Sequence, residues 1–202
     1  MKIEKRNYEY KVDIQVPENF KYKGTILVLG DSFAELGMLK TIDPNNNCLH
    51  VSWMSQLAHS VAHNVRSFGL SGGNEQLCLK MFEKTLHIER VFTIIFHTEY
   101  HREDNLSGEW LPKLEISDYK KWDSLISEKT LHIYWHKNHM MYNFKNGKTL
   151  FCNYWDDKNT NFNFQKQRIP EILGANHMTY YGNLLLTNDI VKIIGDELRF
   201  ND

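Results

Sequence analysis

One short stretch near the N-terminus constrains the fold of this chain more than any other, Thr25-Ile26-Leu27-Val28-Leu29-Gly30-Asp31-Ser32-Phe33. A short, continuous apolar run that ends in glycine is typical of a strand buried on both faces of a parallel sheet. In open α/β sheets, ligands bind just beyond the carboxyl ends of such strands. Two interpretations of Ser32 follow: its hydroxyl faces a substrate, or it caps the helix that begins near Phe33.

The order of the elements that follow predicts the fold class. The spacing of apolar residues predicts helices over residues 33–40, 53–65, 75–85, 127–144 and 180–200, and further strands over 65–70, 91–96 and 149–155. Thr179 is well placed to cap the last helix. Strands that alternate with helices favour a parallel sheet with crossover helices. We therefore expect an α/β domain.

The length of 202 residues fits a single domain spanning 1–202. Residues 1–23 alternate charged and apolar positions, which predicts an edge strand or an extended N-terminal arm. Residues 102–125 are polar and predict an irregular stretch, which we interpret as an insertion.

Composition narrows the class of partner. The formal net charge is only −1, which argues against nucleic-acid binding through a basic face. The N-terminus leads into no apolar signal segment, and no apolar run approaches the ~20 residues that span a membrane. The three cysteines are widely spaced, which favours a reducing compartment over a disulfide framework. We expect a cytoplasmic protein with no nucleic-acid or membrane partner.

Three strand ends and one late loop carry the polar residues that could do chemistry. They are Gly30-Asp31-Ser32, Ser71-Gly72-Gly73-Asn74, His97-Thr98-Glu99-Tyr100 and Asn176-His177. In a parallel sheet the three strand ends lie along one edge, and the loop leads into a helix whose N-terminus can face that edge. A serine nucleophile needs a base and backbone N–H groups for the oxyanion, roles that Ser32, His177 and Gly72 could fill.

This ordered set resembles the SGNH (GDSL-type) hydrolases over residues 25 to 200. The segment from Asn176 to Asn183 is similar to the Asn-His-hydrophobe-Ser/Thr-x-x-Gly signature of phage-encoded or bacterial members. The resemblance implies a three-layer α/β/α fold of flavodoxin-like arrangement. It implies that Ser32 is the nucleophile, that His177 is its general base, and that the N–H groups of Gly72 and Ser32 bind the oxyanion. Asn74 and Glu99 fall in the blocks that line the family's oxyanion and substrate site.

Two positions depart from the family pattern. The third block of the family is Gly-x-Asn-Asp, whereas this chain has His97-Thr98-Glu99-Tyr100. An ionised Glu99 beside the oxyanion would oppose its charge. Glu99 therefore points elsewhere, is protonated or is neutralised by Arg102, or the oxyanion hole is not of the standard kind. The triad aspartate three residues before the histidine is replaced by Gly174. Candidates to orient the imidazole instead are Glu171, Asp156, Asp157 and Glu99, or a backbone carbonyl.

The function implied is therefore a serine esterase or O-acyl hydrolase that needs no cofactor. Its substrate would be a small-molecule or glycan ester, such as an acylated sugar, a lipid or a small ester, cleaved through a Ser-His dyad or an incomplete triad. The alternative is a catalytically inactive SGNH-like binding or structural module, which Gly174 and Glu99 favour.

A weaker alternative from the residues alone is a metal-dependent hydrolase. His132, His136 and His139 would lie on one side of a helix over 127–144, which is acceptable spacing for metal ligands. An ordinary polar face in a chain with ten histidines explains the same spacing more simply.

Overall fold

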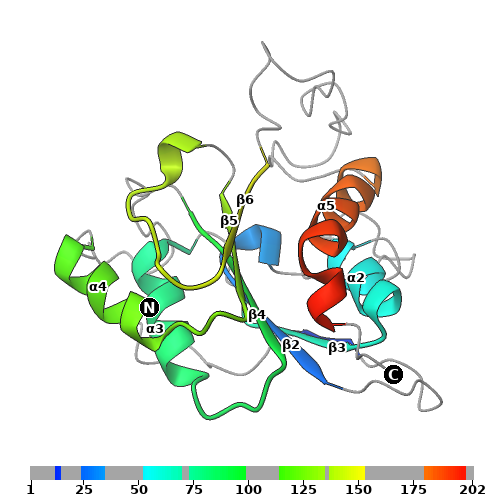
Figure 1. Cartoon of the computed structure of the whole chain (residues 1–202), viewed down its shortest axis with the longest axis horizontal. Helices are drawn as coiled ribbons and strands as arrows, with labels where there is room; N and C mark the ends of the chain where they lie inside the picture. The colour runs from blue at the N-terminus through cyan, green and yellow to red at the C-terminus, as the bar shows by residue number, and fades with distance from the viewer. Residues whose placement is uncertain are drawn as a thin grey trace.

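A six-stranded sheet in the order β1-β3-β2-β4-β5-β6 forms the centre of the computed structural model (Figure 1). The structure describes residues 12–14, 24–34, 52–69, 73–98, 114–134, 137–152 and 180–198, without the side chains of 12–14, 32 and 180–182. The strands are β1 Val12–Ile14, β2 Thr25–Leu29, β3 Asn64–Ser67, β4 Phe92–Phe96, β5 Thr130–Tyr134 and β6 Lys148–Phe151. Only β1 runs antiparallel to its neighbour, so five strands form a parallel sheet.

The strand order reverses at β2, because the chain first moves outward to β3 and then returns past β2 to β4. Such a reversal leaves a crevice at the carboxyl end of the first strand, where ligands of open α/β sheets bind. In this chain the segment that leaves the sheet at that point is Gly30-Asp31-Ser32.

Helices cover both faces of the sheet and make three layers (Figure 1). Helices α2, Trp53–Val61, and α5, Tyr180–Leu198, pack together on one face, while α3, Glu75–Lys84, and α4, Ile116–Leu125, cover the other. The crossovers from β2 to β3 and from β3 to β4 run in opposite directions along the sheet. Because crossovers are right-handed, α2 and α3 must lie on opposite faces. The predicted three-layer α/β/α fold is confirmed.

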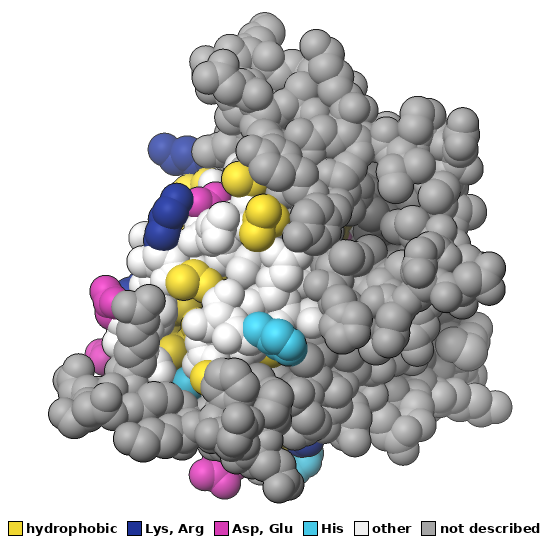
Figure 2. Space-filling view, turned by 90° about the vertical axis from the view of Figure 1, so that its right-hand side faces the viewer, with side chains coloured by type: hydrophobic (Ala, Val, Ile, Leu, Met, Phe, Trp, Pro, Cys, Tyr) yellow, Lys and Arg dark blue, Asp and Glu magenta, His cyan; other side chains and the backbone are white. Residues whose placement is uncertain are grey.

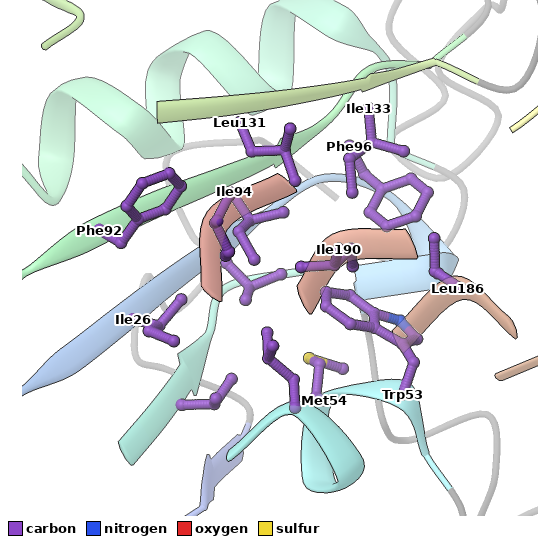
Figure 3. Packing of buried hydrophobic residues seen from close by; sticks show 14 of the residues in the cluster. Ile26, Trp53, Met54, Phe92, Ile94, Phe96, Leu131, Ile133, Leu186 and Ile190 are labelled. Atoms are coloured by element: carbon purple, nitrogen blue, oxygen red, sulfur yellow. The ribbon is translucent and has the colours of Figure 1, made fainter. Parts of the chain in front are cut away.

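The two faces of the sheet bury separate apolar clusters. Ile26 and Val28 of β2 face the α2–α5 cluster, whereas Leu27 and Leu29 face the α3–α4 cluster. This division follows from the period of two along a strand that is covered on both sides. Figure 3 shows the first cluster, with Trp53 and Ile190 brought together beneath the strands.

The prediction of a helix over 127–144 is wrong. Thr130–Tyr134 forms strand β5, buried at every position between β4 and β6, and Lys137–His139 forms one turn of 3-10 helix. A strand buried on both faces carries no alternation of polar and apolar residues, so its sequence could be fitted to a helical spacing.

The prediction that residues 102–125 are irregular is wrong for Ile116–Leu125, which forms α4. Tyr119 and Trp122, three residues apart, are buried on one side of this helix, and Glu115 and Asp118 form a capping box at its start. Their mostly polar neighbours hid this spacing. Residues 102–113 lie outside the described part.

The other predicted elements are present with small shifts at their ends. The helix predicted over 53–65 ends at Val61, and the strand predicted over 65–70 is Asn64–Ser67. The strand predicted over 149–155 is Lys148–Phe151, and residues 153–155 lie outside the described part. The predicted edge strand within 1–23 is β1. The helix predicted from Phe33 begins as the 3-10 helix η2, Ser32–Ala34.

The described part of the surface over α2 and α5 exposes hydrophobic side chains only in small groups. In Figure 2, which shows this side of the molecule, the hydrophobic side chains visible among the described atoms are separate from one another. Within the described ranges, no helix has both the length and the apolar character that a membrane span requires.

Candidate active site

The turn that follows β2 is shaped by Gly30 and Asp31. Gly30 has a φ of +148°, and a Cβ atom there would lie 2.6 Å from Cβ of Phe96 and 2.9 Å from its carbonyl oxygen. The buried Asp31 accepts the N–H of Phe33 at Oδ1, 3.0 Å away, and its carbonyl accepts the N–H of Ala34. These bonds turn the chain sharply at the carboxyl end of β2, so Ser32 stands as the first residue of η2.

Neighbouring elements hold η2 from two sides. The indole Nε1–H of Trp53, the first residue of α2, donates to the carbonyl of Phe33 at 2.9 Å. The hydroxyl of Ser67, the last residue of β3, donates to the carbonyl of Ala34. The backbone of η2 is therefore held by both α2 and β3, and Ser32 is its first residue.

The first turns of α5 are hydrogen-bonded to Trp53, the same residue that holds η2; we call this contact the joint at Trp53. Asn183 Oδ1 accepts the backbone N–H of Trp53 at 2.9 Å, and the hydroxyl of Thr187 lies 3.2 Å from the carbonyl of Trp53. All three residues are buried. Trp53 thus joins η2 to the start of α5, and His177 precedes the first residue of this helix by three positions in the sequence. Figure 1 shows η2 and the first turn of α5 at the same edge of the sheet.

At the end of β3, the predicted site residue Asn74 has a structural task. Its Oδ1 accepts the N–H of Leu77 at 3.0 Å and so caps α3. The side chain is 7% exposed. Asn74 therefore fixes the start of α3 at this edge.

At the end of β4, a glutamate from α3 fixes the outgoing chain. Glu75 Oε2 accepts the N–H of Thr98 at 3.1 Å, and Glu75 Oε1 lies 2.5 Å from Nδ1 of His97. His97 Nε2 in turn lies 2.8 Å from Nδ1 of His132 on β5, whose Nε2 lies 3.2 Å from the carbonyl oxygen of Asn146. We call Glu75, His97 and His132 the carboxylate–histidine chain.

The hydrogen bonds of the carboxylate–histidine chain run in one direction. A carbonyl oxygen only accepts, so His132 Nε2 must carry the proton that points at Asn146. The pKa of His132 is lowered to about 3, chiefly by burial and then by the charge of His97, so its Nδ1 carries no proton and accepts from His97 Nε2–H. At the other end of the series, His97 Nδ1 lies 2.5 Å from Glu75 Oε1, within hydrogen-bond distance.

Aromatic rings enclose these groups. The ring of His97 is stacked on Tyr134 with centroids 4.3 Å apart, and that of His132 on Phe144 at 4.4 Å. Burial raises the pKa of the Tyr134 phenol, and the nearby Glu75 raises it further. The thiol of Cys78 has its pKa raised by burial, then by Glu75 and Asp31, so both carboxylates lie within Coulombic range of it.

Several predicted site residues lie outside the described part. They are Gly72, Glu99, Gly174 and His177, together with Asp156, Asp157 and Glu171. The backbone of Ser32 is described and its side chain is not. Their roles stay predictions.

The histidine arrangement on which the metal alternative depends is absent from the described residues. His132 is buried in strand β5 and hydrogen-bonded to His97, whereas His139 lies in a separate 3-10 turn. His136, the third histidine of that prediction, lies outside the described residues. Among the described residues, no group of three metal-ligating side chains comes together.

Sequence reasoning missed the carboxylate–histidine chain. His97 directly follows the clearest strand, and Glu75 opens α3, but nothing in the sequence pairs residues 22 positions apart. Predicting a strand over Thr130–Tyr134 would have placed His132 beside β4 and given the one available signal.

Comparison with known proteins finds matches among solved structures. No family model matches the chain, and no curated protein matches it. One solved structure that does match is described as that of "a putative lipolytic protein of G-D-S-L family" from Desulfitobacterium hafniense DCB-2. It is 15% identical, with a TM-score of 0.48, and the match covers 84% of this chain and 99% of that one.

Proposed function

We propose that this protein is a serine hydrolase of acyl esters. The observation that carries the proposal is the joint at Trp53, which fastens the serine-bearing turn after β2 to the start of α5. This joint lies at the point where the strand order reverses, which is where open α/β sheets bind ligands.

Ser32 is the proposed nucleophile and His177 the proposed general base. Ser32 Oγ forms a bond to the ester carbonyl carbon as its proton passes to the imidazole of His177. The carbonyl electron pair moves to oxygen and returns when the bond to the alcohol breaks, and the alcohol leaves with the proton from His177. Water then attacks the acyl-serine by the same path and releases the acid.

The N–H groups of Ser32 and Gly72 are the proposed backbone donors to the oxyanion. Removing one such donor from a hydrolase costs about 10²- to 10³-fold in rate. The acid that would orient His177 is proposed from Glu171, Asp156, Asp157 and Glu99, with a Ser-His dyad as the simplest form. The substrate class proposed is an ester of a small alcohol, a sugar or a lipid.

A fluorophosphonate probe tests the proposal, because it forms a covalent bond only with an activated serine. We expect stoichiometric labelling of the wild-type chain, none in Ser32→Ala and strongly slowed labelling in His177→Ala. Ser60→Ala and His59→Ala are matched controls on the exposed side of α2 and keep full labelling. Hydrolysis of p-nitrophenyl acetate should follow the same pattern.

An unlabelled wild-type chain that hydrolyses no short acyl ester contradicts the proposal. That outcome would favour the inactive binding module, for which the replacement of the triad aspartate by Gly174 is the supporting observation.

A further inference from the structure

Thr98, two residues beyond the end of β4, has a buried hydroxyl with no partner in the described part of the chain. The residue is 2% exposed, and its Oγ1 makes no hydrogen bond there. Buried polar atoms in folded proteins nearly always have a partner, so each exception calls for an explanation. One explanation is that the partner arrives with a bound molecule.

The pairing of strands brings Thr98 and Ser32 to the same edge of the sheet. Val28 is paired with Ile94 and Leu29 with Ile95, so each residue of β2 stands beside the residue numbered 66 higher on β4. The close approach of Gly30 to Phe96 continues this register by one step. Ser32 follows Gly30 by two residues, in η2, and Thr98 follows Phe96 by two residues, so both lie just beyond this contact at the carboxyl edge of the sheet.

The side chain of Thr98 is also on the correct face of the sheet. Ile94 and Phe96 point to the α2–α5 side, and His97 points to α3, where it meets Glu75. By the alternation of side chains along an extended chain, Thr98 shares the side of Phe96. The turn that carries Ser32 lies on that side, because the rings of Phe33 and Phe96 are 6.2 Å apart.

Thr98 has two hydrogen-bond donors, its backbone N–H and its hydroxyl, and only the N–H is used by the carboxylate–histidine chain. Glu75 Oε2 already takes the backbone N–H of Thr98, and Glu75 is itself held by His97. The backbone at Thr98 is therefore held on α3 and β5, while its hydroxyl keeps a hydrogen to donate.

We propose that the Thr98 hydroxyl donates a hydrogen bond to the carbonyl oxygen of the ester on which Ser32 acts. The inference rests on the proposed function. As Ser32 Oγ bonds to the carbonyl carbon, the electron pair moves to that oxygen, and the Thr98 O–H stabilises the charge without giving up its proton. The bond weakens again when the carbonyl reforms and the alcohol leaves.

With this assignment, the group at the end of β4 that faces the carbonyl oxygen of the ester is an uncharged hydrogen-bond donor. A carboxylate such as Glu99 would repel the developing negative charge, whereas a hydroxyl attracts it. The donor is Thr98, one residue before the position that the sequence pattern alone selects.

Two variants separate the hydroxyl from the shape of the side chain. Thr98→Val keeps the shape and removes the donor, and Thr98→Ser keeps the donor. With the full chain and a fluorophosphonate probe, we expect labelling about 100-fold slower in Thr98→Val. Thr98→Ser should stay within about threefold of the wild type, since its donor is intact. Labelling of Thr98→Val at the wild-type rate overturns the proposal, while loss of labelling in Ser32→Ala still upholds the esterase.

Thermal unfolding of the free protein tests the same hydroxyl without any activity. A hydroxyl with no partner destabilises the empty protein, so Thr98→Val should unfold at the wild-type temperature or up to about 4 °C above it. Unfolding several degrees below the wild type shows an internal partner and overturns the proposal, whatever the labelling. If the wild-type chain takes up no probe, the proposed function fails and the donor role with it, even where this shift is found.

Discussion

Two separate constraints, the backbone conformation and the lack of space, exclude a side chain at Gly30. Its φ of +148° lies in a region that residues with a Cβ rarely adopt, and the space a Cβ would need is taken by Phe96. The backbone conformation cannot relax, because the hydrogen bonds of Asp31 and η2 hold the chain that follows Gly30. Phe96 cannot move away either, because it belongs to β4, which is paired with β2. Glycine is required here by the fold, whatever the function of Ser32.

Replacing Gly30 by alanine should therefore lower the free energy of unfolding by about 2–4 kcal/mol, from backbone strain together with steric overlap. Urea unfolding followed by circular dichroism measures it. Gly195→Ala is the matched control, because that glycine lies within α5 and a Cβ there meets only Val191 Cγ1 at 3.4 Å. Helix propensity predicts a gain of about 0.5–1 kcal/mol for the control. Equal effects at the two glycines would contradict this account.

His132 makes stability depend on pH in the acid range. Its pKa is about 3 in the folded protein, against ~6.5 in an unfolded chain. Between these values the unfolded chain binds a proton that the folded chain does not, so stability falls as the pH drops below about 6.5. Above about pH 7 His132 has no such effect. The polar groups that face His132 are the ring of His97 and the carbonyl of Asn146.

The variant His132→Gln keeps one acceptor and one donor and removes the titration. Its unfolding free energy should fall less steeply with acidity, by up to about 1.4 kcal/mol per pH unit between pH 6 and pH 4. Urea titrations at several pH values give both slopes. His59→Gln on the exposed side of α2 is the control and should keep the wild-type slope. Parallel profiles for wild type and His132→Gln would refute the assignment.

At the scale of elements, α2 begins at an unusual junction. The first N–H groups of a helix have no partner within the helix, and here the one at Trp53 is satisfied by Asn183 of another helix. Ser52 supplies the ordinary cap by accepting the N–H of Ser55. The first residue of α2, Trp53, is thus hydrogen-bonded to both α5 and η2.

The variant Asn183→Leu should lose about 1–3 kcal/mol of stability, because the buried N–H of Trp53 keeps no acceptor. We expect slower fluorophosphonate labelling as well, since the start of α5 loses its tie to η2. Asn188→Leu makes the same change at an exposed position of the same helix and should alter neither quantity. If the two variants behave alike, the junction has no role in holding α5.

At the scale of the whole molecule, the central strands should open last. β2 and β4 are each hydrogen-bonded on both sides and buried, whereas β6 has one neighbour among the described strands and exposed residues at its start. Hydrogen–deuterium exchange measured by mass spectrometry should find the slowest amides in β2 and β4 and faster exchange in β6. Equal protection of β6 and β4 would contradict this order.

The layers and the order of strand and helix could be predicted because each depends on local spacing of apolar residues. The spacing in α2 and the apolar run of β4 suffice to place those elements. β5 could not be told from a helix, because a strand covered on both faces has no polar side to mark its period. The contacts between Glu75, His97 and His132 depend on the packing of three elements, which no local pattern contains.

The candidate site divides in the same way. Ser32 and its turn were predicted from Gly-Asp-Ser after an apolar run, and the structure describes the backbone at that turn. The free hydroxyl of Thr98 could not be predicted, because only the completed packing shows that none of the described groups bonds to it.

The junction at Trp53 also has a consequence for synthesis on the ribosome. The turn with Ser32 and the start of α2 are synthesised before α5, whereas the acceptor for the Trp53 N–H is Asn183, 130 residues later in the chain. Until Asn183 has left the exit tunnel, the Trp53 N–H of the nascent chain lacks this acceptor. The turn with Ser32 is therefore joined to α5 only after those 130 residues have been added.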